Sequence, residues 1–266
     1  MIKFFRRIRQ RLLSENKFSK YLLYAIGEII LVVIGILIAL YINNHNEELK
    51  SEAQLQQYIE KLIVSFENDM TKMDNGGNQY AFIAHSGQYL LVQAGLSTFD
   101  WEKDGLEVPS YIPTDHIWNN NIPDTLNTDF IPVAFLWTIR LGDLTIATPI
   151  LEEMKSTGVY SKLPNDIKND IEYYSAQWFN NIGPSHQAKI ESYVNKWENS
   201  LGTLGLFNSS IDELDNPLSI LAADKERVFL LKLLIRESGW FSLKAKWHKE
   251  QAQLIKSDLE AYLKTF

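Results

Sequence analysis

The chain contains no cysteine among its 266 residues. This absence excludes disulfide bonds, thiol catalysis, paired-cysteine redox motifs and metal sites built on cysteine. Small secreted domains often need disulfides because their hydrophobic cores are small, but a chain of this length can bury a sizeable core without them. The lack of cysteine therefore does not conflict with a location outside the cytoplasm.

Motifs that carry catalytic chemistry are also missing. The sequence has no G-x-S-x-G nucleophile motif and no glycine-rich phosphate loop. None of its histidines has the H-E-x-x-H spacing that places two imidazoles on one helix face. They stand far apart, at His45, His85, His116, His186 and His248. We therefore expect a protein that is not an enzyme, and we predict no catalytic, cofactor-binding or metal-binding residues.

The longest apolar stretch runs from Tyr21 to Ile42 and contains a single charged residue, Glu28. At about 1.5 Å per residue, a helix of this length spans about 33 Å, enough to cross a hydrocarbon core of about 30 Å. The stretch predicts one transmembrane helix. The alternative is a cleaved signal peptide, but the apolar run is too long for one and no small-residue cleavage site follows it.

The charges around this stretch predict its orientation. Residues 1–20 contain seven lysines and arginines and one acid, whereas the whole chain has a net charge of −7. Since basic residues beside a span stay on the cytoplasmic side, the N-terminus is expected in the cytoplasm and residues 43–266 outside it. We predict a single-pass protein of the bacterial inner membrane with an acidic periplasmic domain. The acidic balance argues against nucleic acid as a partner.

The basic tail also has an amphipathic pattern. Its apolar residues, from Ile2 to Leu12, fall on one face of a helix. The arginines, which lie largely off this face, are Arg6, Arg7, Arg9 and Arg11. This pattern predicts an interfacial helix whose arginines contact anionic lipid headgroups. The alternative is that the basic residues only fix the orientation of the span.

Inside the span, a stripe of mostly small residues recurs every four positions. The stripe consists of Gly27, Leu31, Gly35 and Ala39. Small residues let a second membrane helix approach closely, and Glu28 lies beside them. A carboxylate at membrane depth costs about 2.5–3.5 kcal/mol on insertion scales and usually faces a partner or water. We predict that Glu28 and the stripe contact another membrane helix; the alternative is a shallow or protonated glutamate without a special role.

Several blocks of this sequence resemble one family of proteins. They are A-I-G-E at 25–28, V-I-G-I-L-I-A-L at 33–40 and N-N-x-N-E at 43–47. Together they resemble a family of bacterial envelope proteins of unknown function with one N-terminal span, although His45 stands where Trp is expected. Residues 148–158 and 166–174 are similar to a second block of the family. The resemblance implies the topology and places Glu28 in the family pattern, but it implies no reaction.

After the span, the sequence predicts a helix with one apolar face. The apolar residues recur every three or four positions, at Leu55, Ile59, Leu62, Phe66, Met70 and Met73. No helix breaker separates this face from the span, so we expect one nearly continuous helix. The apolar face packs either on later helices of the same chain or on a second copy. The Asp74-Asn75-Gly76-Gly77 segment predicts a break or kink, followed by another helical run to Gly95.

Residues 97–147 have a different composition, with prolines and aromatic residues among polar ones. Long irregular segments inside a domain are usually functional or poorly ordered. We expect an ordered excursion in which Trp101, Tyr111 and Trp118 form a candidate recognition surface. The alternative is that these aromatic side chains cap the core of a helical bundle.

Helix start and stop signals return in residues 148–266. Pro149 opens a helix that ends before Gly158, and Asp224 caps a long final run that Gly239 is expected to kink. Helices beginning near Pro164 and Pro184 are joined by a short Gly-Pro connection, which predicts an antiparallel hairpin.

The predicted fold class is all-α, with an N-terminal transmembrane helix continuing into a periplasmic bundle of long antiparallel helices and one irregular excursion. The five predicted segments are a cytoplasmic tail (1–20), the span (21–42), a membrane-proximal helix (43–96), the irregular segment (97–147) and the bundle (148–266).

Three functional hypotheses follow from these predictions. The first is a non-enzymatic envelope scaffold or accessory subunit that binds a protein partner or a second copy of itself. The second is a periplasmic ligand sensor whose pocket is lined by the tryptophan-rich segment and which signals through a partner in the membrane. The third is a proton-coupled subunit of a membrane complex that uses Glu28.

Overall fold

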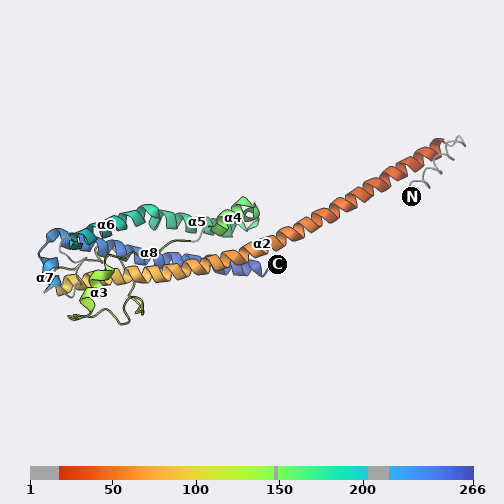
Figure 1. The fold of residues 1–266 in the computed structure, drawn as a ribbon. Helices are drawn as coiled ribbons and strands as arrows, with labels where there is room; N and C mark the ends of the chain where they lie inside the picture. The colour runs from red at the N-terminus through yellow and green to blue at the C-terminus, as the bar shows by residue number, and fades with distance from the viewer. Residues whose placement is uncertain (1–17, 147–148, 203–215) are drawn as a thin grey trace. The chain divides into compact units, whose positions relative to one another are not determined.

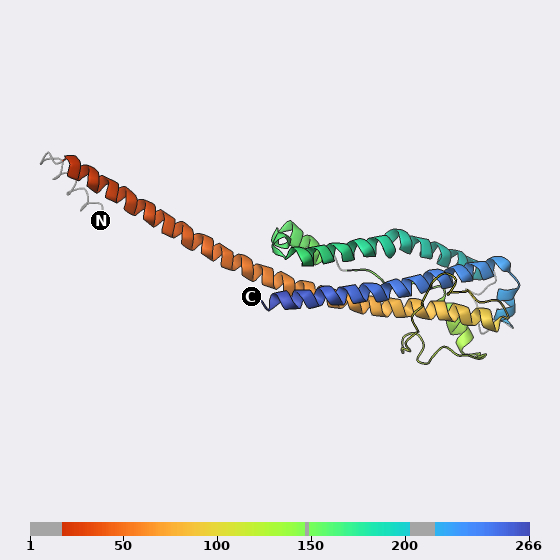
Figure 2. The ribbon, with the colours of Figure 1, turned by 180° about the vertical axis from the view of Figure 1, so that it is seen from behind.

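The computed structural model describes residues 18–146, 149–202 and 216–266. Their secondary structure is helical, with one isolated β-bridge and no strand within these ranges. The predicted all-α fold is therefore confirmed. The chain divides into two compact units, residues 1–57 and 58–266, and Figures 1 and 2 show the second unit as a layered set of helices.

Helix α2 (Phe18–Gln93) contains the predicted span. From Leu22 onward it includes a window that is long and apolar enough to cross a membrane, with a mean hydropathy of 2.7. None of that window is buried by the rest of the chain, since the side chains of Leu23 and Leu31 are 78% and 70% exposed. The helix continues past residue 57, which confirms the expected continuous helix.

Residues 58–93 of α2 lie against helix α8 (Lys225–Leu263), and the two run antiparallel (Figures 1 and 2). Glu67 pairs with Lys256 at 2.9 Å between carboxylate and ammonium, and Asp74 pairs with Lys249 at 2.7 Å. The apolar face of α2 is buried within the same chain. The expectation that this face packs on the chain's own later helices is confirmed.

Three glycines of α2 allow close packing, two of them against α8 and one against residues 143–144. A Cβ atom added to Gly77 would lie 2.9 Å from the Cβ of Ala245, and one added to Gly87 would lie 2.5 Å from Cγ1 of Ile235. At Gly76 it would collide with the backbone carbonyl oxygen of Asp143. The predicted break at Gly76 and Gly77 is wrong, because the contacts that these glycines permit outweigh their weak helix propensity.

Helices α5 (Asn165–Asn181) and α6 (Pro184–Gly202) both pack along α8, one after the other (Figure 2). Lys244 donates to the Asn181 carbonyl oxygen at 2.8 Å, and Lys189 pairs with Glu237 at 2.8 Å, so both helices run antiparallel to α8. The predicted hairpin is wrong. Proline at the first position of a helix needs no N–H partner, so the chain bends there without reversing.

The remaining elements are short. They are α3 (Phe130–Trp137), α4 (Pro149–Ser156), the 3₁₀ turn η1 (Val159–Lys162) and α7 (Pro217–Ala222). Gly158 has the left-handed φ of 76° expected beyond a helix end, and Asp224 caps α8 by accepting hydrogen bonds from the backbone of Glu226 and Arg227. Helix α8 continues through Gly239, where a kink was expected, without a break in the helix. A Cβ atom added at this glycine would lie 2.8 Å from Cγ2 of Val108.

Candidate functional site

The loop between α2 and α3, residues 94–129, is held on one face of α2 by hydrogen bonds from polar side chains to loop backbone groups. The side chains that make these bonds are Asn78, His85, Gln88 and Tyr89. Their spacing of three, four and seven residues places them on one side of the helix. A segment with almost no secondary structure of its own is therefore ordered by the helix beneath it.

Two side-chain amides of α2 each donate one hydrogen bond to a loop residue and accept one from the same residue. Asn78 donates to the Ile112 carbonyl oxygen at 2.8 Å and accepts from the Ile112 N–H at 2.7 Å. Gln88 does the same with Phe99, at 2.6 and 2.9 Å. Each amide satisfies a backbone donor and acceptor that have no ladder partner. These two pairs fix where the loop leaves α2 and where it returns across it.

Two tyrosine hydroxyls complete the framework. The Tyr89 hydroxyl accepts from the Asn127 N–H at 2.8 Å. The Tyr111 hydroxyl accepts from the N–H groups of Thr114 and Trp118, each at 3.1 Å, and donates to the Trp118 carbonyl oxygen. Tyr111 thereby closes the tight turn that carries the isolated bridge between Thr114 and Trp118.

The aromatic residues of the loop pack onto the core. Phe82 of α2 contacts the rings of Tyr111 at 4.7 Å and Phe130 at 5.8 Å, and Trp118 lies 5.1 Å from Phe130. Tyr111 is only 8% exposed. Trp101 is partly buried and meets the His85 ring edge-on at 4.9 Å. The arrangement favours the core-capping alternative over a recognition surface formed by Trp101, Tyr111 and Trp118.

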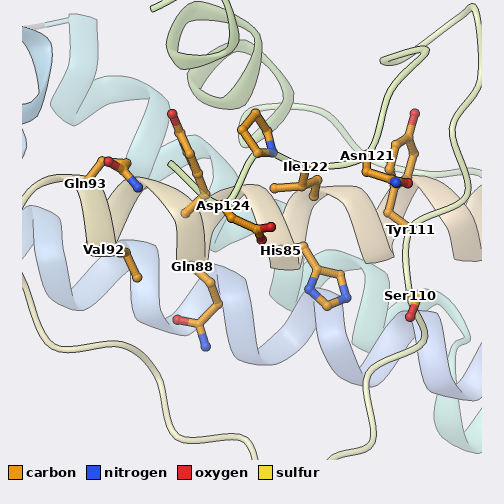
Figure 3. Close-up of a pocket in the computed structure, with 11 residues that line it drawn as sticks. His85, Gln88, Val92, Gln93, Ser110, Tyr111, Asn121, Ile122 and Asp124 are labelled. Carbon is orange, nitrogen blue, oxygen red and sulfur yellow. The ribbon is translucent and has the colours of Figure 1, made fainter. Parts of the chain in front are cut away.

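A cavity of about 420 Å³ lies between α2 and this loop (Figure 3). Helix α2 contributes His85, Gln88, Tyr89, Val92 and Gln93, and the loop contributes Ser110, Tyr111, Asn121, Ile122, Pro123 and Asp124. Of the three aromatic residues expected to form a recognition surface, Tyr111 alone lines this cavity. Cavities of a few hundred cubic ångströms with aromatic walls and a few polar groups are typical of small-molecule sites.

The electrostatics of the cavity are simple. Asp124 is its only carboxylate, and its lining contains no lysine or arginine. Burial lowers the pKa of His85 although a hydrogen bond to the Pro109 carbonyl oxygen opposes the shift, so the imidazole is neutral at pH 7. Because a carbonyl oxygen can only accept, Nε2 of His85 carries the proton, 2.9 Å from Pro109, and Nδ1 is an acceptor. The cavity therefore offers one negative charge, no positive charge, and amide and hydroxyl groups that can both donate and accept.

The predicted membrane residues belong to the first of the two compact units, residues 1–57. The stripe and its neighbouring acid lie on α2, at Gly27, Glu28, Leu31, Gly35 and Ala39. Among the described residues, a Cβ atom added to Gly27 or Gly35 would meet no atom within 4 Å, so none of them covers the helix at these two glycines. The predicted lipid-binding residues, Arg6, Arg7, Arg9 and Arg11, lie outside the described residues.

Sequence reasoning missed most of the cavity. His85, Gln88 and Asp124 carry no motif, and their proximity depends on how a long irregular loop folds back over α2. One signal was available: between Tyr80 and Leu91 the apolar positions of α2 are interrupted by polar residues at 85 and 88 on one side of the helix. Polar residues at helical spacing beside a core face indicate a partner that needs hydrogen bonds.

Residues that could hold a metal ion do not gather in the described ranges, which contain no group of three or more histidine, aspartate or glutamate side chains with suitable placement.

Comparison with known proteins gives one match. Neither the curated proteins nor the solved structures contain a match to this chain. The matched region, residues 28–83, begins at Glu28, runs along α2 and ends two residues before His85. Every lining residue of the cavity and the second block of the sequence resemblance lie outside it. Over residues 28–83 the chain matches the family of unknown function DUF6090, which confirms the resemblance to an uncharacterised family.

Proposed function

We propose that this protein is a membrane-anchored ligand-binding module without enzymatic activity, and that the cavity between α2 and the loop is its binding site. The observation that supports it is the construction of that cavity. Its loop wall is tied to α2 by paired hydrogen bonds at Phe99 and Ile112 and by the Tyr89 hydroxyl at Asn127, so the site is formed before any ligand enters. A preformed site binds without a large ordering cost.

The lining determines the chemical class of ligand in this proposal. One carboxylate, aromatic rings and neutral acceptors stabilise a small organic cation, because ammonium groups are attracted to carboxylates and to the faces of aromatic rings. The lack of lysine and arginine in the lining disfavours anions. The ligand that fits is a small amine or quaternary ammonium compound.

The location in this proposal follows from the apolar part of α2 and the basic residues before it. Residues 21–42 anchor the chain in a bacterial inner membrane, residues 1–20 lie in the cytoplasm, where the arginines contact anionic lipid, and residues 43–266 lie in the periplasm. The cavity is then accessible to solutes of the periplasm.

Calorimetric titration of the full chain in lipid nanodiscs tests the binding function. Choline and putrescine serve as cationic probes, and acetate and phosphate serve as anionic ones. We expect a cation to bind and Asp124→Asn to weaken that binding by about tenfold, since it removes the only negative charge of the lining. Asp115→Asn, an exposed acid of the same loop outside the cavity, is the matched control. Absence of cation binding, or anion binding of equal strength, would contradict the proposal.

A second candidate function is that of an accessory subunit that contacts another membrane protein through the stripe beside Glu28. The observation that favours it is the open face of α2 at Gly27 and Gly35. In-cell crosslinking of wild type and Glu28→Gln, read by mass spectrometry, tests it. A heteromeric partner lost in the variant supports this role and the proton-coupled version of it. Self-crosslinks that the variant leaves unchanged favour a homo-oligomer in which Glu28 has no part.

A further inference from the structure

A second cavity lies on the opposite side of α8, between α5 and α8. It has a volume of about 230 Å³ and is lined by Tyr173, Gln177, Asn181, Lys244, Trp247, His248 and Gln251. It shares no lining residue with the cavity on α2. Because α5 and α8 pack directly against each other, its two walls are held by the core of the domain.

Two aromatic side chains at this cavity are unusually exposed. Trp247 of α8 is 50% exposed and Tyr173 of α5 is 57% exposed. Large aromatic rings usually bury most of their surface, and two exposed rings at the edge of one hollow indicate a binding surface. A flat apolar ring face with polar edges suits a ligand that is itself part apolar and part polar.

The lining of the cavity includes a buried ring nitrogen that has no hydrogen-bond partner among the described residues. His248 is 5% exposed, and its Nδ1 atom is buried without a hydrogen-bond partner among the described residues. Burial lowers the pKa of His248 to about 4, although the Gln177 backbone opposes the shift, so the ring is neutral at pH 7. With the proton on Nε2, Nδ1 accepts a hydrogen bond. A buried polar atom without a partner calls for an explanation, and a ligand donor supplies one.

The other polar groups are mainly amides. Gln177, Asn181 and Gln251 are amides, and Asn181 Nδ2 already donates to Gln177 Oε1 at 2.8 Å. The remaining amide hydrogens and lone pairs of the three can bond to a ligand, and the lining contains no carboxylate. Lys244 is partly committed, since its ammonium donates to the Asn181 carbonyl oxygen at 2.8 Å. Neutral amides in this number fit a ligand that carries several hydroxyl groups better than a metal ion or a highly charged anion.

We propose that this second cavity binds a single saccharide ring. The C–H faces of a sugar pack on Trp247 and Tyr173, its hydroxyl groups bond to the three amides, and one hydroxyl donates to Nδ1 of His248. Lys244 supplies a single positive charge, so a sugar acid binds more tightly than its neutral counterpart. This site stands independently of the cation site proposed on α2.

Calorimetric titration of the full chain in lipid nanodiscs, without sugar-based detergents, tests the proposal. The probes are glucose, N-acetylglucosamine and glucuronate. We expect at least one to bind and Trp247→Ala to weaken it by about tenfold. Phe179→Ala is the matched control because Phe179 is 62% exposed on the same helix as Tyr173 but does not line the cavity. That control and Asp124→Asn are expected to change the affinity by less than about twofold.

The acceptor role of His248 has its own pair of variants. His248→Asn keeps an acceptor near the position of Nδ1 and is expected to retain binding, whereas His248→Leu removes it and is expected to lose it. Since His248 is buried and either variant can unfold, Trp247→Ala remains the deciding surface variant. The proposal is overturned if no saccharide binds at concentrations up to about 10 mM. Binding that Trp247→Ala leaves unchanged, or phosphate binding in place of saccharides, overturns it too.

Discussion

Helix α2 contains two apolar regions that differ in what covers them. In residues 22–42, large apolar side chains are exposed, with Leu31 at 70%. In residues 58–91, side chains of the same types are buried, with Ile59 at 0% and Leu62 at 1%. Secondary structure does not separate the two regions, because both lie in one helix of mostly good helix formers.

The difference lies in how the apolar residues are arranged around the helix. Residues 22–42 are apolar on every side, and no single neighbouring helix can cover such a surface, which suits a lipid environment. Residues 58–91 are apolar on one side and polar on the other, and α8 covers the apolar side. The glycines follow the same division, since Gly35 has open space around it whereas Gly76 and Gly87 are in close contact.

The largest expected effect comes from removing an apolar side chain in each region. Leu62→Ala leaves a cavity in a closely packed core and is expected to lower the free energy of unfolding of residues 58–266 by about 2–5 kcal/mol. Leu31→Ala is the matched variant and is expected to leave that free energy unchanged. All seven tryptophans lie between residues 101 and 247, so tryptophan fluorescence during urea titration reports on this domain alone. Equal effects of the two variants would contradict the comparison.

Substitution of one glycine in each region is expected to give the next largest difference in stability. Gly76→Ala places a methyl group against the Asp143 carbonyl oxygen and is expected to destabilise the domain by about 1–3 kcal/mol, although alanine is the better helix former. Gly35→Ala adds a methyl group to open space and is expected to have no effect on the domain. Thermal unfolding followed by tryptophan fluorescence measures both. A Gly76→Ala variant as stable as wild type would show that α2 does not need the close approach.

The smallest expected effect is a change in the free energy of unfolding with pH. His248 has a folded pKa of about 4, below its ordinary value, because burial disfavours the charged ring, while Lys244 adds repulsion and the Gln177 hydrogen bond opposes the shift. The unfolded chain therefore binds the proton more tightly, and stability is present above about pH 6.5 and lost as pH falls toward 4. We expect a loss of about 2 kcal/mol between pH 7 and pH 5, measured by urea unfolding at each pH.

Substitutions assign this pH dependence to the buried region. His248→Asn is expected to remove most of it. His85 contributes in the same direction, since burial also lowers its pKa. A pH dependence that survives in His248→Asn at full size would place its origin elsewhere.

Much of the fold could be predicted from local signals. Pro149, Gly158 and Asp224 mark helix ends through their own backbone and side-chain chemistry, and the structure places helix ends there. The prediction of a hairpin at Gly183 and Pro184 was wrong because a proline indicates where a helix begins but not the direction in which the helix runs. Direction was decided by the continuous surface of α8, which lies far away in sequence.

The prediction of a break at Gly76 and Gly77 was wrong, and the cavity was not predicted, for related reasons. Gly76 and Gly77 are poor helix formers when considered alone, and their role depends on Asp143 and Ala245, which no local pattern connects to them. The cavity combines His85 of α2 with Asp124 of a loop that has almost no secondary structure. Predicting it requires knowing that Asn78 and Gln88 bind the backbone of that loop.

The pairing of α2 with α8 has a consequence for biosynthesis. Helix α8 leaves the ribosome after the other described helices of the domain, yet it covers the apolar face of α2, the first of them. Contacts between distant parts of a chain form slowly, and exposed apolar surface in the meantime favours aggregation. Until residues 225–263 have been made, the face that carries Gly77 and Gly87 remains uncovered. Nascent chains that end before α8 are therefore expected to bind chaperones and to be degraded by proteases.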